Sequence, residues 1–245
     1  MKLRLSAVFT IVLASYASVP AAGGDRTVEA GLVPGASTSA VKLTPTDLST
    51  IRGANYRGSG AADTTDYWRH YDASETQRDL SYANRLRLNQ LRVFVNYASW
   101  EADKPAFRRN LVDLARACYR HRIGLMITIG ETQTFINEDR TIDRDRIREF
   151  VKELVTALGD EPALAFWDAS NEPDYNPPGA PRDQQQKRIE IARLIAAMLH
   201  ELDKKTPVTI GVAYERTMET LADAVDVLSF HDYLSTRAAI AEDIA

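Results

Sequence analysis

The sequence predicts an α/β fold, a (β/α)8 TIM barrel that is truncated after about the sixth strand. Short segments rich in β-branched and aromatic residues alternate with longer segments whose apolar residues recur at helical spacing. No turn signal joins two strands directly, so the pattern indicates a parallel sheet with helical crossovers. Polar residues end nearly every predicted strand, which is where a barrel enzyme draws its catalytic side chains. These residues are Asn55, Asn96, Glu131, Glu172, Glu215 and His231.

The six strands are expected at residues 51–56, 91–97, 124–130, 163–170, 207–213 and 225–230. Helices are expected at residues 74–88, 103–121, 143–158 and 183–204, with a short one before the sixth strand and the beginning of another at 236–245. In the first helix, Leu80, Ala83 and Leu86 are expected to face the core. A doubly wound open sheet fits the same alternation. It loses its best support because no Gly-x-Gly-x-x-Gly follows the first strand.

The amino-terminal region is predicted to lie outside the fold. Residues 1–22 have a basic start, a short apolar run and a zone of small residues, which together indicate a signal peptide. The apolar run is too short to span a bilayer, so we expect a secreted or periplasmic protein with no membrane attachment after cleavage. Residues 23–46 are rich in Gly, Ala, Ser, Thr and Pro, and are expected to form a linker. The partial barrel then occupies residues 47–245.

The composition is that of an ordinary globular domain, with 44% hydrophobic and 26% charged residues. The net charge is −4 and no basic residues cluster in the sequence, so the chain lacks the positive surface that nucleic-acid-binding proteins present. The single cysteine, Cys118, excludes an internal disulfide and lies in a helical apolar stripe, so we interpret it as a buried core thiol. No cluster of His, Asp and Glu has metal-ligand spacing, and the sequence implies no metal and no cofactor. It leaves the oligomeric state open.

The most informative segment is the fourth strand with the residues that follow it, 165–174. An apolar run containing Trp167 ends abruptly in Asn171 and Glu172, and Pro173 then breaks the strand. A plain strand-to-helix turn with a solvated glutamate would have the same three residues. A carboxylate at the carboxyl end of a parallel strand, however, is placed for chemistry.

Trp-x-x-x-Asn-Glu-Pro resembles the acid/base signature of the glycoside hydrolase clan A barrels, especially the cellulase-like family five. The other matches fall in the family's order. The segment that ends in Asn55 resembles the first-strand Arg-Gly-x-Asn, and Phe230-His231-Asp232-Tyr233 resembles the family's His-x-Tyr. Arg92, in an otherwise apolar strand, is similar to the arginine beneath the catalytic carboxylates. Since a buried guanidinium needs an anionic partner, we expect a carboxylate near Arg92; a purely structural ion pair is the alternative.

This resemblance implies an exported retaining glycoside hydrolase, cellulase- or mannanase-like, that cleaves O-glycosidic bonds of a β-linked polysaccharide or oligosaccharide. Glu172 would be the general acid/base, and Asn171 and His231 would contact sugar. Tyr233 would orient the nucleophile. Asn55 and Arg92 would complete the substrate site. The alternative for His231 is a capped loop histidine.

Protonating a leaving oxygen requires a carboxylic acid, so the role of Glu172 calls for a raised pKa. We expect burial among Trp167, Tyr175 and Tyr233 to supply that increase.

The chain departs from the family in two places. Its third strand ends in Glu131, where many members carry a histidine that helps bind substrate, and this leaves the substrate class open. No carboxylate matches the family's nucleophile, which we expect to follow Ala245 in an incomplete barrel. The barrel-facing sides of Leu125, Ile127, Ile129 and Val227 would then lack partners. A non-catalytic carbohydrate-binding barrel is the competing hypothesis. An unrelated hydrolase or reductase lacks both a Gly-x-Ser-x-Gly elbow and a phosphate loop.

Overall fold

The computed structural model describes residues 40–178 and 181–233. The predicted signal peptide, most of the predicted linker and the helix expected at 236–245 lie outside these residues. Within them, six parallel strands form one sheet, in the order of the sequence. The strands are β1 (Gly53–Tyr56), β2 (Gln90–Val95), β3 (Gly124–Ile129), β4 (Leu164–Asn171), β5 (Val208–Val212) and β6 (Val227–Phe230).

Five helices connect consecutive strands, and all of them were expected from the sequence. They are α2 (Ala73–Arg85), α4 (Lys104–Arg120), α5 (Arg144–Leu158), α6 (Arg182–Leu202) and α7 (Glu215–Leu221). Four short elements were not predicted, namely η1 (Leu48–Thr50), α1 (Thr64–Arg69), α3 (Tyr97–Ala102) and η2 (Thr132–Phe135). None of the helices in the described part of the chain is long and apolar enough to cross a membrane.

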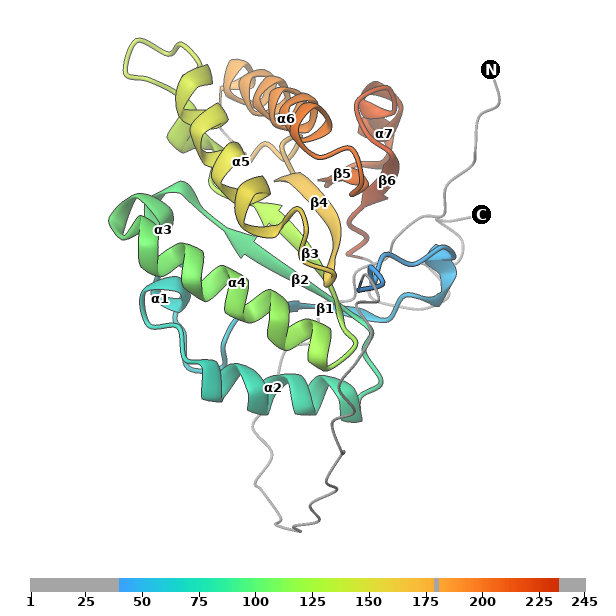
Figure 1. Ribbon diagram of the computed structural model, residues 1–245. Coiled ribbons are helices and arrows are strands. Elements are labelled where there is room, and N and C mark those ends of the chain that lie inside the picture. The colour runs from blue at the N-terminus through green and yellow to red at the C-terminus, as the bar shows by residue number, and fades with distance from the viewer. Residues whose placement is uncertain (1–39, 179–180, 234–245) are drawn as a thin grey trace, which may run out of the picture.

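The strand order identifies the architecture as a half-barrel. Every pairing joins two strands that are consecutive in the sequence. A doubly wound sheet would reverse its strand order at a switch point and carry helices on both faces. Here α2, α4, α5, α6 and α7 lie in an arc around one face of the sheet (Figure 1). The predicted parallel TIM barrel, present in part, is confirmed, and β1 and β6 are the edges of the described sheet.

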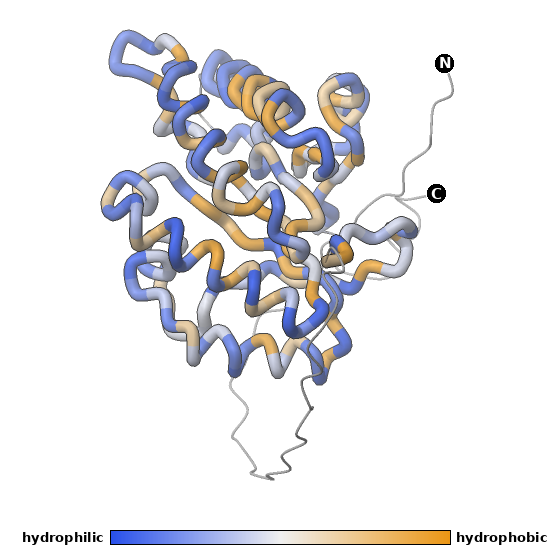
Figure 2. Tube along the Cα trace, in the orientation of Figure 1, coloured by the Kyte–Doolittle hydropathy of each residue, from blue (hydrophilic) through white to orange (hydrophobic). Residues whose placement is uncertain are grey.

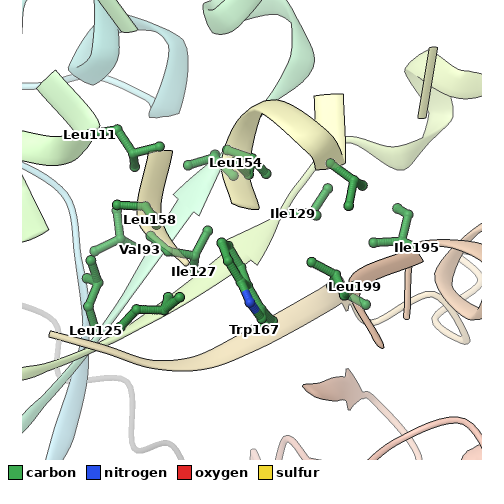
Figure 3. Close-up of a cluster of buried hydrophobic side chains, with 14 of the residues drawn as sticks. Val93, Leu111, Leu125, Ile127, Ile129, Leu154, Leu158, Trp167, Ile195 and Leu199 are labelled. Atoms are coloured by element: carbon green, nitrogen blue, oxygen red, sulfur yellow. The ribbon is translucent and has the colours of Figure 1, made fainter. Parts of the chain in front are cut away.

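The main core lies between the sheet and the helices, and the strands bury their apolar residues there. The tube in Figure 2 is hydrophobic along the strands and on the inner sides of the helices. Leu125, Ile127 and Ile129 of β3 are fully buried in this cluster with Leu111 and Leu154 (Figure 3). The expectation that these three β3 residues face the barrel interior is therefore wrong. Because Thr128 is the only polar residue of β3, the sequence of this strand gives little indication of which face meets the helices.

A second, smaller cluster fills the bottom of the half-barrel. Met126, Ala165, Phe166 and Val227 pack together there, and the partly buried Leu48 and Ile51 cover them.

The segment before η1 is attached at the same end. The Leu43 amide donates to the Pro162 carbonyl at 2.8 Å, and Lys42 Nζ donates to Thr206 Oγ1, also at 2.8 Å. Lys42 and Leu43, which fall in the segment predicted to be a linker, thus contact the half-barrel.

Side-chain caps and left-handed residues set the helix ends. Asp63, Asp72, Asn96, Asp103 and Asp143 each accept a hydrogen bond from the first turn of a helix. At the other end, Arg87 and Arg122 both have φ 57°, a conformation that usually selects glycine after a helix. The helix expected to reach residue 88 therefore ends at Arg85. Leu86, expected to be buried, is 57% exposed.

Candidate active site

The carboxyl ends of β2, β3 and β4 surround a cavity of about 490 Å³. Polar and apolar atoms contribute about equally to its wall. The polar residues include Asn96, Glu131, Gln133, Ser170, Asn171, Glu172, Gln184 and Arg188, and the apolar ones include Phe94, Tyr175 and Pro177. Glu172 follows β4 directly, as the sequence predicted, and its side chain therefore lies at the mouth of the half-barrel.

Glu172 is held by residues from the two following strands. Its backbone has φ 46°, and its amide donates to the Gly211 carbonyl of β5 at 2.6 Å. Its carboxylate oxygen Oε1 lies 2.6 Å from His231 Nδ1 and accepts a hydrogen bond from the Tyr233 hydroxyl. Glu172, His231 and Tyr233, which were predicted to share one site, are thus in direct contact. A left-handed conformation is strained for a non-glycine residue, so the fold fixes Glu172 against a local preference.

These contacts lower the pKa of Glu172, and the expectation of a raised pKa is therefore wrong. The hydrogen bond from His231 is the largest effect, and the Tyr233 hydroxyl acts in the same direction, while burial opposes both. Burial also raises the pKa of Tyr233 to about 12. Trp167 does not desolvate Glu172, because its side chain lies on the helix side of the sheet (Figure 3). Its indole donates to Asp203 there, at 2.9 Å.

A buried ion pair lies beneath the site and confirms that Arg92 has an anionic partner. Arg92 Nε and Nη2 lie 2.9 and 2.5 Å from Asp168 Oδ2, and both side chains are almost fully buried. Thr128 Oγ1 donates to the same oxygen at 2.9 Å, and the Gly211 amide donates to Asp168 Oδ1 at 3.2 Å. Arg92 Nη2 also donates to Asn171 Oδ1 at 3.0 Å, which connects the ion pair to the cavity.

The sequence did not identify Asp168 as this partner, although a signal for it was present. Asp168 and Glu172 are four positions apart, an even spacing, in and just after a strand that begins with apolar residues. Alternation places such residues on one face, away from the helices.

Two further residues that the sequence reasoning missed hold the loop after Glu172. The Asp174 carboxylate is 1% exposed and accepts from the amides of Ala213 and Tyr214, at 2.8 and 3.0 Å. From α6, Arg188 Nη2 donates to the Tyr175 carbonyl at 2.6 Å. In the sequence, Asp174 is simply a carboxylate near a strand end, and nothing in the helical pattern around Arg188 distinguishes that residue.

The remaining strand-end residues differ in their placement. Asn96 Nδ2 donates to Glu131 Oε1 at 3.0 Å, so the ends of β2 and β3 meet at the cavity. Asn55 pairs in register with Arg92 on the neighbouring strand, but it does not line the cavity. Glu215 begins α7, is exposed and also lies outside the cavity lining.

Comparison with known proteins finds similarity only at the level of structure. No family model matches the chain, and no curated protein matches it. It is similar to the exo-beta-1,4-mannosidase Op5Man5 from Opitutaceae bacterium strain TAV5, with a TM-score of 0.55 and 18% identity over 68% of this chain and 32% of that one. It is also similar to GH5_18 from Streptomyces cattleya in complex with Manb1-4GlcNAc, with a TM-score of 0.53 and 14% identity over 67% and 45% of the two chains.

A third similar structure is beta-glucuronidase 3 from Bacteroides uniformis, with a TM-score of 0.51 and 13% identity over 74% of this chain and 20% of that one. The chain thus spans less than half the length of each of these three structures. At such identities the likeness establishes the fold, a half-barrel like part of the family-five, clan A glycoside hydrolase barrel.

Proposed function

We propose that this chain carries the acid/base half of an exported retaining glycoside hydrolase that cleaves a β-linked polysaccharide or oligosaccharide. The observation that carries the proposal is the position of Glu172. It follows the fourth strand of a half-barrel like that of known glycosidases, and it faces a cavity between strand ends. His231 and Tyr233 contact its carboxylate, and Asn171, the preceding residue in the chain, lines the same cavity.

In the proposed mechanism, Glu172 protonates the leaving oxygen and then, as its conjugate base, activates water. Among the described residues, both hydrogen bonds to its carboxylate reach Oε1, which leaves Oε2 for the substrate. The lowered pKa keeps the group ionised before substrate binds. A ligand that draws His231 or Tyr233 into contacts of its own removes hydrogen bonds that lower this pKa and favours the protonated acid.

Retention also needs a nucleophilic carboxylate about 5–5.5 Å from the acid/base group. Asp168 is unsuited to this task because Arg92 neutralises it in a buried pair. We expect the nucleophile in sequence that follows Ala245. A non-catalytic carbohydrate-binding barrel is the second candidate. Such a barrel would lack the nucleophile, and the carboxylate of Glu172 would accept hydrogen bonds from sugar hydroxyls in the cavity.

The test is Glu172→Gln in the complete gene product, assayed on cellulose, mannan, xylan and β-glucan. Turnover of natural glycosides should fall by about 10²- to 10⁴-fold, since the amide cannot donate the proton, while sugar binding changes little. Activated aryl glycosides, which need less acid assistance, should lose less. Glu138→Gln, an exposed glutamate outside the cavity lining, is the matched control. Normal turnover in Glu172→Gln refutes the acid/base role, and sugar binding without turnover in the wild type supports the second candidate.

A further inference from the structure

We propose that the cavity beside Glu172 ranks sugars by charge, with ammonium-bearing sugars first, neutral sugars second and uronates last, and that Glu131 sets this order. The inference takes from the proposed function only that the ligand is a carbohydrate. It concerns recognition and does not require that the chain cleaves what it binds.

Among the described residues, Glu131 is held at the cavity wall by an amide and pairs with no cation. It follows β3 with φ 54°, and its Oε1 accepts from Asn96 Nδ2 at 3.0 Å. Asn96 is itself 1% exposed and immobilised, because its Oδ1 caps α3 at Ser99 and its Nδ2 also contacts Thr65. The hydrogen bond from Asn96 therefore holds the Glu131 carboxylate in place. Because the Asn96 amide is uncharged, it does not neutralise the negative charge of Glu131.

The other charges at the cavity do not cancel that of Glu131. The charged lining residues are Glu131, Glu172 and Arg188, a formal sum of −1. Arg188 is 9% exposed, and its guanidinium donates to oxygens of Pro173, Tyr175 and Asn176 in the loop after Glu172. Behind the wall, Arg92 is neutralised by Asp168. Among the described residues, the positive charges at this site are thus directed to partners within the protein.

An unsatisfied hydroxyl independently indicates that the cavity receives a polar ligand. Ser170 lines the cavity and is 0% exposed, and its Oγ has no hydrogen-bond partner in the described part of the chain. A buried hydroxyl without a partner costs about 1–3 kcal/mol, which a ligand hydroxyl or amine would recover. Tyr175, 46% exposed, adds an aromatic surface of the kind on which a sugar ring can lie.

The cavity should therefore bind positively charged sugars somewhat more tightly than negatively charged ones. An ammonium group placed near Glu131 forms a charge-assisted hydrogen bond, whereas a uronate carboxylate there meets like charge. For partly exposed groups such an interaction changes affinity by about fivefold. One structure of similar fold is a beta-glucuronidase, so a shared fold alone would not predict that this chain disfavours a uronate.

The test is equilibrium binding, by ligand-observed NMR and calorimetry, of three β-1,4-linked disaccharides to the complete gene product. The probes are cellobiose, the glucosamine disaccharide and cellobiouronic acid, at about pH 6, where the amine is protonated. We expect about fivefold steps in affinity in the order amine, neutral sugar, uronate, and these steps should shrink between roughly 0.02 M and 0.5 M NaCl.

Glu131→Gln should compress the three affinities to within about twofold of one another, while the exposed Glu138→Gln control keeps the wild-type order. Equal affinity of cellobiose and the uronate for the wild type, or an unchanged order in Glu131→Gln, overturns the inference and leaves the proposed function standing. Failure of all three sugars to bind overturns both.

Discussion

His231 Nδ1 lies 2.6 Å from Glu172 Oε1, although the two residues are 59 positions apart in the chain. Because a carboxylate oxygen only accepts hydrogen bonds, Nδ1 carries the proton in this pair. The contact joins the ends of β4 and β6, so the whole width of this part of the sheet must form before the site exists. The lowered pKa of Glu172 therefore depends on tertiary structure, as does its position.

Replacing His231 by phenylalanine should raise the pKa of Glu172, since the largest pKa-lowering contact is removed and burial, which raises the pKa, remains. The carboxyl-carbon NMR titration of Glu172 measures this directly. His70→Phe, at an exposed histidine that pairs with Asp66, should leave the Glu172 titration unchanged. An unaltered Glu172 titration in His231→Phe would refute the assignment of cause.

The same contact predicts a pH dependence of stability. A carboxyl whose pKa is lowered by folding stabilises the fold above its ordinary value of 4.5, and this contribution disappears as the pH falls through the lowered pKa. Wild-type urea-unfolding free energies should therefore fall more steeply below about pH 4.5 than those of Glu172→Gln. Parallel curves for the two proteins would contradict the linkage.

Gly211→Ala should disturb the site from the side of β5. A Cβ at Gly211 would lie 2.6 Å from His231 Nε2 and 2.9 Å from its Cε1, so the ring must shift and its hydrogen bond to Glu172 is disturbed. We expect the pKa of Glu172 to rise, as in His231→Phe. Gly130→Ala is the matched control, because a Cβ there meets neighbours at ordinary contact distances of 3.5 Å. If Gly211→Ala leaves the His231 ring resonances and the Glu172 titration unchanged, the backbone has absorbed the methyl group.

Substitutions of Arg92 and Asp168 should have strongly non-additive effects on the free energy of unfolding. Asp168→Asn leaves a buried guanidinium without its counter-charge, and Arg92→Met leaves a buried carboxylate, so each should cost about 3–5 kcal/mol in the free energy of unfolding. The double variant should cost clearly less than the sum of the two, because neither charge is then orphaned. Additive losses in urea unfolding would show that the two groups do not act as a pair.

Asp174→Asn should loosen the loop that carries Glu172. An amide offers one acceptor oxygen where the carboxylate receives two backbone amides, so about 1–3 kcal/mol of stability should be lost. Hydrogen exchange at Ala213 and Tyr214 should accelerate at the same time. The exposed Asp183→Asn, which breaks only a surface pair with Arg140, should change stability by less than about 1 kcal/mol. Equal effects of the two substitutions would contradict the role given to Asp174.

Arg122→Gly should stabilise the chain by up to about 1 kcal/mol, because it relieves a left-handed arginine at the end of α4. The same change at the exposed Arg109, in the middle of α4, should instead cost about 1 kcal/mol. Thermal unfolding of both variants measures the opposite signs. A destabilised Arg122→Gly would mean that contacts of the arginine side chain outweigh the backbone strain.

The sequence by itself located the strands and crossover helices of the described fold and the edge of the sheet that carries the polar residues. It succeeded because apolar spacing, caps and breakers act within a few residues, and because the carboxyl ends of parallel strands share one edge. The extended run through Trp167 and the break after Glu172 were visible in this way.

Only the tertiary structure decided which face of β3 meets the helices, which carboxylate neutralises Arg92 and in which direction the pKa of Glu172 moves. With Thr128 as its only polar residue, β3 has too little alternation for its inner side to be read from the sequence. The partner of Arg92 is 76 residues away, and the histidine that lowers the pKa of Glu172 stands two strands further along the sheet. Such contacts depend on the register between distant strands, and ångström differences in distance determine their electrostatic effect.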